Sequence, residues 1–218
     1  MKANYVQRLR IVFRKDGPTR FIGHLDLART LERMLNRAQI PLAYTQGYNP
    51  RPRMQLAIAL PLGFTSECEI ADIWLLERID PKTALLALAP KSAPGIEIRN
   101  ISEIELREQA LQPEEGTYLV TLLDPVDGEA LKDKVNRLLA AEQLPRERRG
   151  KNYDLRPLIL DLKILDRIDD PIQLLMRLSL LPGKTGRPDE ILAAIDLDPL
   201  AAKIHRTELV LKRPDTSD

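Results

Sequence analysis

Arginines recur at four-residue steps within residues 20–53. Arg29, Arg33 and Arg37 would share one side of an α-helix, because residues four apart lie on neighbouring turns. A guanidinium group stays charged and donates hydrogen bonds in pairs, so such a row suits phosphates or carboxylates. The same row could equally be a solvated helix face on which Glu32 supplies partial compensation. The spacing leaves both interpretations open.

His24 is the residue in this segment best suited to proton transfer. We expect it in the first turn of the helix, where the positive end of the helix dipole disfavours a second positive charge. A neutral imidazole there could accept a proton, donate a hydrogen bond or stack on a base; a histidine that only caps and packs is the alternative. Asp26 follows Gly23 at capping-box spacing. The helix is therefore predicted to begin near His24.

The loop after this helix combines aromatic, amide and arginine side chains. Tyrosine rings offer stacking faces and amides read donor and acceptor edges, as recognition of single-stranded RNA requires. Glycine permits a close backbone approach and proline restricts the chain, so an ordinary rigid turn is the alternative. The loop residues are Tyr44, Thr45, Gln46, Gly47, Tyr48, Asn49, Pro50, Arg51, Pro52 and Arg53. The predicted binding surface consists of Arg20, His24, Asp26, Arg29, Arg33, Tyr44, Gln46, Gly47, Tyr48, Asn49, Pro50, Arg51 and Arg53.

Basic residues are concentrated at the start of the chain. Residues 1–60 contain eleven Lys and Arg against three Asp and Glu, whereas residues 61–145 contain eight against sixteen. Such a local excess favours an anionic partner more strongly than the net charge of +1 suggests.

The remaining composition excludes several kinds of site. The 218 residues include no apolar run near the length of a membrane span. The first ten residues have no apolar core of a signal peptide, so a cytoplasmic location is expected. A single cysteine, Cys68, excludes a multi-cysteine zinc or iron–sulfur site supplied by this chain alone. No metal-binding or standard catalytic motif is found, so no metal site is predicted.

Hydrophobic periodicity predicts two similar halves, each with the order β-α-β-β-α-β. In the first half we expect strands at 6–13, 54–62, 69–76 and 96–104, and helices at 24–39 and 81–89. In the second half we expect strands at 118–123, 158–165, 172–180 and 204–211, and helices at 127–141 and 188–195. This order predicts an α+β protein of tandem ferredoxin-like halves, with antiparallel sheets and helices on one face.

The predicted boundaries follow from these elements. Residues 1–106 would form the first half, 107–116 a polar linker, 117–213 the second half and 214–218 a disordered tail. An Arg-Pro pair precedes the second strand of both halves, at Arg51 and at Arg156, which supports a duplication.

The second half has its own basic, turn-rich segment, RERRGKNYDLRP, which repeats the side-chain types of the first loop. A mobile basic loop is the alternative interpretation, and a lone histidine on a strand is usually structural. The predicted secondary surface consists of Arg149, Lys151, Tyr153, Asp154, Arg156, Arg187, His205 and Arg206.

Three motifs carry a resemblance to a known family. They are Phe13, Lys15, Gly17, Arg20-Phe21 and Gly23-His24-Leu25-Asp26-Leu27; Tyr44-Thr45-Gln46-Gly47-Tyr48-Asn49-Pro50-Arg51-Pro52; and Ala59-Leu60-Pro61-Leu62-Gly63. The chain resembles the radical SAM-linked protein family, a domain of unknown function, in which serine is more frequent at the position of Gly23. The resemblance implies a stand-alone form of a domain that is otherwise fused to, or encoded beside, a radical SAM protein with a cobalamin-binding region. A radical SAM cluster needs three cysteine thiolates, so this chain cannot hold one alone. The resemblance implies that the iron–sulfur cluster, SAM and cobalamin are bound only by that partner.

Three functions are consistent with these residues. The leading hypothesis is a non-catalytic module that presents RNA to a radical SAM partner, with arginines on phosphates and tyrosines on bases. Tandem ferredoxin-like halves are also similar to CRISPR repeat-RNA processing endoribonucleases, in which His24 would act as the general base without a metal, assisted by Tyr44 or an arginine. In the third, the loop from Tyr44 to Arg53 docks on the radical SAM enzyme as a protein-binding adaptor.

Overall fold

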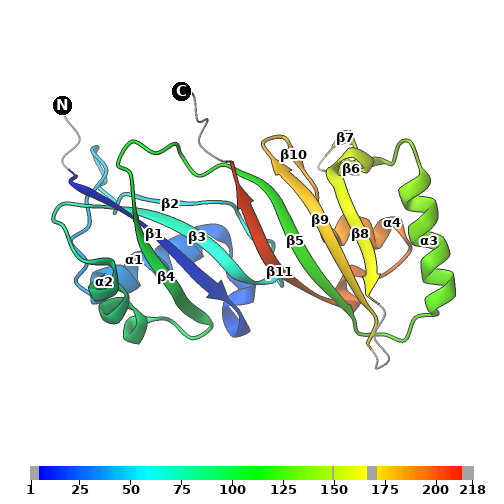
Figure 1. Ribbon diagram of the computed structural model, residues 1–218, viewed down its shortest axis with the longest axis horizontal. Coiled ribbons are helices and arrows are strands. Elements are labelled where there is room, and N and C mark those ends of the chain that lie inside the picture. The colour runs from blue at the N-terminus through cyan, green and yellow to red at the C-terminus, as the bar shows by residue number, and fades with distance from the viewer. Residues whose placement is uncertain (1–4, 149, 166–170, 213–218) are drawn as a thin grey trace. The chain divides into compact units, whose positions relative to one another are not determined.

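The computed structural model describes residues 5–148, 150–165 and 171–212. The chain divides into two compact units, unit 1 (Met1–Gln112 with Lys212–Asp218) and unit 2 (Pro113–Leu211). Both units combine helices with a mostly antiparallel sheet, which confirms the predicted α+β class (Figure 1). The predicted tail at 214–218 lies outside the described residues.

Unit 1 has the predicted order of strands and helices. Its sheet runs β2-β3-β1-β4, and every neighbouring pair is antiparallel. The elements are β1 (Gln7–Lys15), the 3-10 helix η1 (Gly17–Phe21), α1 (His24–Arg37), β2 (Met54–Leu56), β3 (Thr65–Leu75), α2 (Pro81–Leu88), the 3-10 helix η2 (Ala89–Lys91) and β4 (Ile96–Ile104).

Both helices of unit 1 pack on one face of this sheet. Alternation along a strand sends successive side chains to opposite faces, and Leu9, Ile11 and Phe13 of β1 are fully buried in the core. The same core cluster contains Leu31 of α1 and Leu88 of α2. The apolar stripe of α1 therefore faces the sheet and leaves its arginine side outward.

The opposite face of the unit 1 sheet holds a buried ionic network. Asp72 of β3 is fully buried and accepts hydrogen bonds from Arg8 at 2.5 Å and from Arg10 at 2.9 and 3.0 Å. Arg8 also donates to the backbone oxygens of Glu108 and Gln109, which ties the segment after β4 to the sheet. The hydrogen bond to Asp72 raises the pKa of Arg10 above its ordinary value, against the opposing effect of burial.

Unit 2 repeats the strand order of unit 1. Its sheet runs β8-β9-β5-β11 with antiparallel neighbours, and the short β10 also pairs with β9. The elements are β5 (Pro113–Leu122), α3 (Gly128–Ala140), β6 (Pro145–Arg148), β7 (Lys151–Asp154), the 3-10 helix η3 (Arg156–Leu158), β8 (Ile159–Leu165), β9 (Gln173–Leu181), β10 (Lys184–Thr185), α4 (Pro188–Ala194), the 3-10 helix η4 (Pro199–Ala201) and β11 (Ala202–Leu211).

Several segments differ from the sequence-based prediction. Strand β5 begins at Pro113, inside the segment expected as a linker at 107–116. The strand expected at 54–62 stops at Leu56, and a turn leading to Gly63, with φ at +84°, replaces its second half. Pro61 lacks the N–H group that a continuing strand would donate. The basic segment expected as a loop contains the hairpin β6–β7, whose strands pair from Pro145↔Asp154 to Arg148↔Lys151.

Candidate functional site

The outward side of α1 carries the arginine row. Arg29, Arg33 and Arg37 are all exposed. Arg29 forms an ion pair with Asp26 at 3.2 Å, and Arg37 donates to the backbone oxygen of Lys91 at 2.8 Å. Among the described residues, no side chain forms an ion pair or hydrogen bond with the guanidinium group of Arg33. Arg33 is therefore the member of the row that is free to bind an anion.

The loop at 44–53 is a rigid projection rather than an open coil. Tyr44 and Pro52 form an isolated antiparallel bridge. The backbone N–H of Thr45 donates to the carbonyl of Arg51 at 2.8 Å, and the Arg51 N–H donates to the Thr45 hydroxyl at 3.0 Å. Arg53 closes the base by donating its N–H to the Ala43 carbonyl. These bonds fix the two stems and leave the tip between them.

The tip presents its side chains entirely to solvent. Tyr48 has a relative exposure of 102%, and Gln46, Asn49 and Pro50 are also exposed. Gly47 has a φ of +149° and no heavy atom within 4 Å of where a Cβ would stand. The Arg51 side chain has no ion-pair or hydrogen-bond partner within the described part of the chain. A stacking ring, two amides and a free cation are thus displayed together.

Asn36 joins the loop to the arginine face of α1. The Tyr44 hydroxyl donates to Asn36 Oδ1 at 3.5 Å, near the outer limit for a hydrogen bond. Asn36 lies three residues after Arg33, so the two side chains are neighbours on the helix surface. Sequence reasoning did not select Asn36, although its polar side chain falls outside the apolar stripe. The structure therefore brings Arg33, Asn36 and the 44–53 loop to one surface, which we call the helix–loop surface.

Two other predicted arginines are engaged with aromatic rings. The Arg53 guanidinium lies 4.6 Å from the ring centroid of Tyr5 and 5.1 Å from that of Trp74. Arg20 lies 4.6 Å from the centroid of Phe21. Arg53 is half-buried, so it supports the base of the loop more directly than it faces solvent.

His24 is at the other end of α1 from the loop. Twelve residues separate His24 from Asn36, which corresponds to about 18 Å along the helix axis. Near His24 in sequence, the exposed side chains include Phe21, Leu25 and Asp26. The structure does not bring His24 and Tyr44 together, so Tyr44 is not placed to assist His24 as a general base.

The residues predicted as a secondary surface have different surroundings. Arg206 is fully buried, 5.9 Å from the ring centroid of Tyr118, and so contributes nothing to a surface. His205 is half-buried on β11, and Arg187 forms an ion pair with Asp189, which raises the pKa of Arg187.

The remaining secondary residues belong to the β6–β7 hairpin or its base. Arg156 donates to the backbone oxygens of Leu139 and Ile159, and Asp154 accepts backbone hydrogen bonds at the hairpin base. Lys151 is exposed and Tyr153 is half-buried. Arg149 lies outside the described residues.

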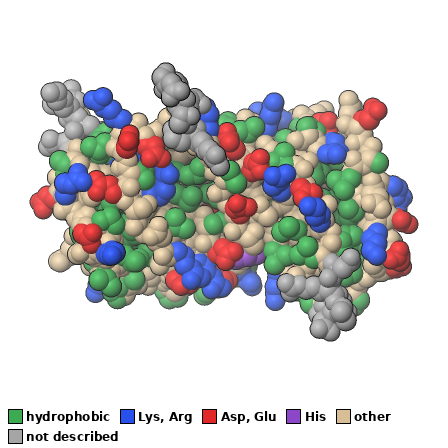
Figure 2. Space-filling model, in the orientation of Figure 1, with side chains coloured by type: hydrophobic (Ala, Val, Ile, Leu, Met, Phe, Trp, Pro, Cys, Tyr) green, Lys and Arg blue, Asp and Glu red, His purple; other side chains and the backbone are tan. Residues whose placement is uncertain are grey.

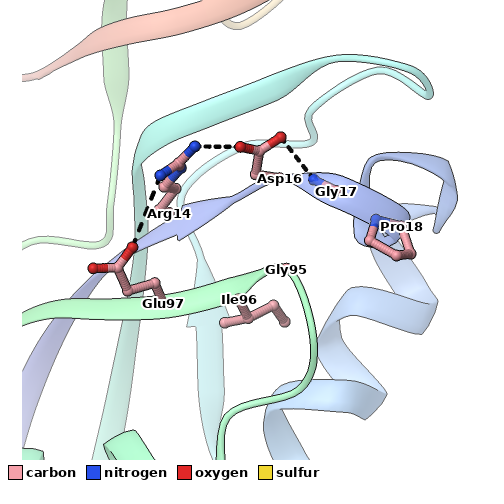
Figure 3. Close-up of a pocket in the computed structure, with 7 residues that line it drawn as sticks. All are labelled: Arg14, Asp16, Gly17, Pro18, Gly95, Ile96 and Glu97. Carbon is pink, nitrogen blue, oxygen red and sulfur yellow. Dashed lines mark hydrogen bonds and ion pairs between the residues drawn. The ribbon is translucent and has the colours of Figure 1, made fainter.

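A shallow pocket of about 330 Å³ in unit 1 lies away from these residues (Figure 3). Its lining includes Arg14, which lies between the carboxylates of Asp16 and Glu97. The lone cation is thus neutralised by two acids, and none of the predicted binding residues lines the pocket. This arrangement gives the pocket no excess charge with which to hold an anion.

Charges of both signs are interspersed over the face of the protein drawn in Figure 2. Across the described residues, no helix is long and apolar enough to cross a lipid bilayer. No three His, Cys, Asp or Glu side chains in the same residues are grouped so that they could hold a metal ion.

A family model matches residues 8–188 of this chain, and its description is "Uncharacterized protein conserved in bacteria (DUF2344)". The chain belongs to this family. The match takes in unit 1 from Arg8 onward and most of unit 2, so both the helix–loop surface and the β6–β7 hairpin are parts of a DUF2344 protein. No curated protein is similar enough in sequence to this DUF2344 chain to count as a relative.

Three solved structures have some similarity to this DUF2344 protein. The first is described as the structure of an H/ACA RNP bound to a substrate RNA containing 2′-deoxyuridine (10% identity, TM-score 0.47, 93% of this chain and 47% of that chain). The second is a Cbf5-Nop10-Gar1 complex, with 11% identity and a TM-score of 0.49 over 94% of this chain and 50% of that chain. The third is an archaeal box H/ACA sRNP Nop10-Cbf5 complex, with 12% identity and a TM-score of 0.42 over 94% of this chain and 48% of that chain. The chain spans about half the length of each, and likeness at this level does not establish a shared activity.

Proposed function

We propose that this DUF2344 protein is a non-catalytic RNA-recognition module that binds an unpaired stretch of RNA at the helix–loop surface. One observation carries the proposal: the fully exposed ring of Tyr48 stands on a loop whose base is fixed by backbone hydrogen bonds. A ring with no contacts of its own contributes nothing to folding, and every base offers a face on which such a ring can stack. Its exposure is therefore better explained by a ligand than by stability.

The free arginines supply the second part of RNA recognition. Phosphate contacts fix the position of a nucleic acid, whereas base contacts supply sequence preference. Arg33 and Arg51 are exposed cations without partners in the described residues, so a phosphate would not have to displace an existing ion pair. Gln46 and Asn49 could then read the edges of a base stacked on Tyr48.

Rigidity of the loop strengthens this proposal. Ordering a flexible loop on binding costs free energy, and a loop that is already fixed avoids that cost. The bridge between Tyr44 and Pro52 and the two Thr45–Arg51 hydrogen bonds hold the stems before any ligand arrives.

Three finer features belong to the same proposal. We infer that the two units are tandem ferredoxin-like halves, which is supported by the strand orders β2-β3-β1-β4 and β8-β9-β5-β11. We also infer that a radical SAM enzyme in the cytoplasm performs the chemistry on the bound RNA. That partner would carry SAM and cobalamin, and also the iron–sulfur cluster, for which this chain with its one cysteine lacks the thiolates.

The test is binding of a fluorescently labelled, unstructured RNA to the full chain, followed by anisotropy. Tyr48→Ala should weaken binding by about 5- to 150-fold, since stacking on an aromatic ring contributes about 1–3 kcal/mol per base. Tyr48→Phe keeps the ring and should bind as the wild type does.

A second pair of variants tests the phosphate contacts. Arg33→Gln with Arg51→Gln should weaken binding by about tenfold or more and reduce its salt dependence. The matched control, Arg78→Gln with Arg99→Gln, removes two cations of unit 1 that are already paired with Glu103 and Glu97. Equal binding by the two double variants would refute the helix–loop surface as the RNA site.

A further inference from the structure

Strands β6 and β7 pair as a hairpin (Figure 1), and the register of the two strands places the cations of the hairpin on one face. Arg146 pairs with Tyr153 and Arg148 with Lys151 across the two strands. Side chains two apart on a strand, and those directly opposite on its partner, share a face. Arg146, Arg148, Lys151 and Tyr153 therefore form one surface, which we call the basic ribbon face, whereas Glu147 is directed to the opposite face.

Contacts at the base of the hairpin hold this ribbon in place. Asp154 Oδ1 accepts the backbone N–H of Leu144 at 2.8 Å and that of Arg156 at 3.0 Å, which closes the base of the hairpin. Burial and the carboxylate of Glu190 in α4 raise the pKa of Tyr153 above its ordinary value. Lys151 is exposed, whereas Arg146 and Arg148 are half-buried. The three cations therefore lie on a hairpin whose base is fixed, although the segment reads as a loop in sequence.

The cations of the basic ribbon face differ from others in unit 2. Lys132 is paired with Glu129 at 2.9 Å and Lys163 with Asp161 at 2.8 Å. Arg146, Arg148 and Lys151 form no ion pair with any described residue. A group of three unpaired cations beside a tyrosine matches the combination of phosphate contact and aromatic contact that RNA-binding surfaces use.

We propose that the basic ribbon face is a second RNA-binding element, which holds the sugar–phosphate backbone while unit 1 reads unpaired bases. This inference rests on the proposed function, because it assigns the same class of ligand to a second part of the chain. Two contacts on one chain raise the effective concentration of each for the RNA, so a strand long enough to reach both binds more tightly than either contact alone would allow.

The test compares two triple variants of the full chain. Arg146→Gln, Arg148→Gln and Lys151→Gln remove the ribbon cations. The control, Lys132→Gln, Lys163→Gln and Arg177→Gln, removes the same number of charges from unit 2 at cations paired with Glu129, Asp161 and Glu115.

Affinity for a long unstructured RNA is measured by anisotropy over a range of KCl concentrations. The ribbon variant should bind about 10- to 100-fold more weakly at about 0.1 M salt, and the slope of log K against log salt should fall by about 2, because each phosphate contact on a single strand contributes about 0.7. The control should keep the wild-type slope, and far-ultraviolet circular dichroism should show all three proteins equally folded.

The outcomes separate this inference from the proposed function. Equal binding by the two triple variants overturns the ribbon inference and leaves the helix–loop surface intact. Loss of binding in the ribbon variant, with wild-type binding by the Arg33 and Arg51 double variant, supports the ribbon and overturns the helix–loop surface. No RNA binding by the wild type at any salt concentration overturns both.

Discussion

Replacing Asp72 with asparagine should strongly destabilise unit 1. The carboxylate is fully buried and accepts hydrogen bonds from Arg8 and Arg10. Asparagine keeps one acceptor oxygen but removes the negative charge, and its amide nitrogen would face a guanidinium group. Arg8, with its side chain 2% exposed, would then be a buried charge without compensation.

The expected loss is about 3–5 kcal/mol in the free energy of unfolding. Breaking a buried ion pair by removing one partner costs about that much. A separate estimate agrees, because two lost hydrogen bonds to charged groups cost about 1.5–3 kcal/mol each. Since a domain is stable by only about 5–15 kcal/mol, the variant loses a large part of its stability.

Trp74 provides the assay, because it is the single tryptophan of the chain and lies in β3 of unit 1. Its ring is 8% exposed and 4.7 Å from the Arg8 guanidinium carbon. Urea unfolding followed by tryptophan fluorescence therefore reports on unit 1 around this network.

The control for Asp72→Asn is Arg78→Ala, which breaks the exposed pair with Glu103. The Arg78 side chain is 65% exposed, and exposed pairs contribute about 0–1 kcal/mol. If Asp72→Asn shifted the unfolding free energy no more than this control does, the buried network would not stabilise unit 1 as we argue.

Two further predictions concern backbone strain and a phenol. Gly95→Ala should lower the free energy of unfolding more than Gly63→Ala does in the same urea assay. Both glycines have φ at +84°, but a Cβ on Gly95 would lie 2.2 Å from the Asp16 carbonyl oxygen, whereas a Cβ on Gly63 would meet no heavy atom within 4 Å. Burial and Glu190 raise the pKa of Tyr153 above 10.0, so its contribution to stability is present below about pH 10 and is lost as pH rises through the folded pKa. Ultraviolet titration should show Tyr153 ionising at a higher pH than an ordinary tyrosine, and at a lower pH in the Glu190→Gln variant than in the wild type.

Local patterns in the sequence predict the elements that have a regular apolar period. Helix α1 begins at His24 as expected, and β4 spans the expected Ile96–Ile104. Their apolar residues repeat at the helical or strand period, and burial of that face determines the element. The mixed α+β class follows from the same periodicity.

Features that depend on distant partners could not be predicted this way. Arg8 and Asp72 look like surface residues in sequence, yet they are buried because β1 and β3 place them next to each other. Arg206 is fully buried in unit 2 although its neighbours in sequence are His205 and Thr207.

The residues of the helix–loop surface were likewise identified only in part from the sequence. The 44–53 loop was selected from its residue types, but its link to α1 through Asn36 depends on a contact across eight residues. The β6–β7 hairpin has hardly any apolar residues, so it lacks the alternation by which a strand is recognised.

The most direct test of RNA recognition is crosslinking and sequencing of RNA bound to the tagged protein in its own cells. The comparison is with a variant that combines Arg33→Gln, Tyr48→Ala and Arg51→Gln, all three at exposed side chains. We predict that the wild type enriches a defined RNA and that the variant loses it. Recovery of no RNA above background, or of the same RNA by both proteins, would contradict recognition at the helix–loop surface.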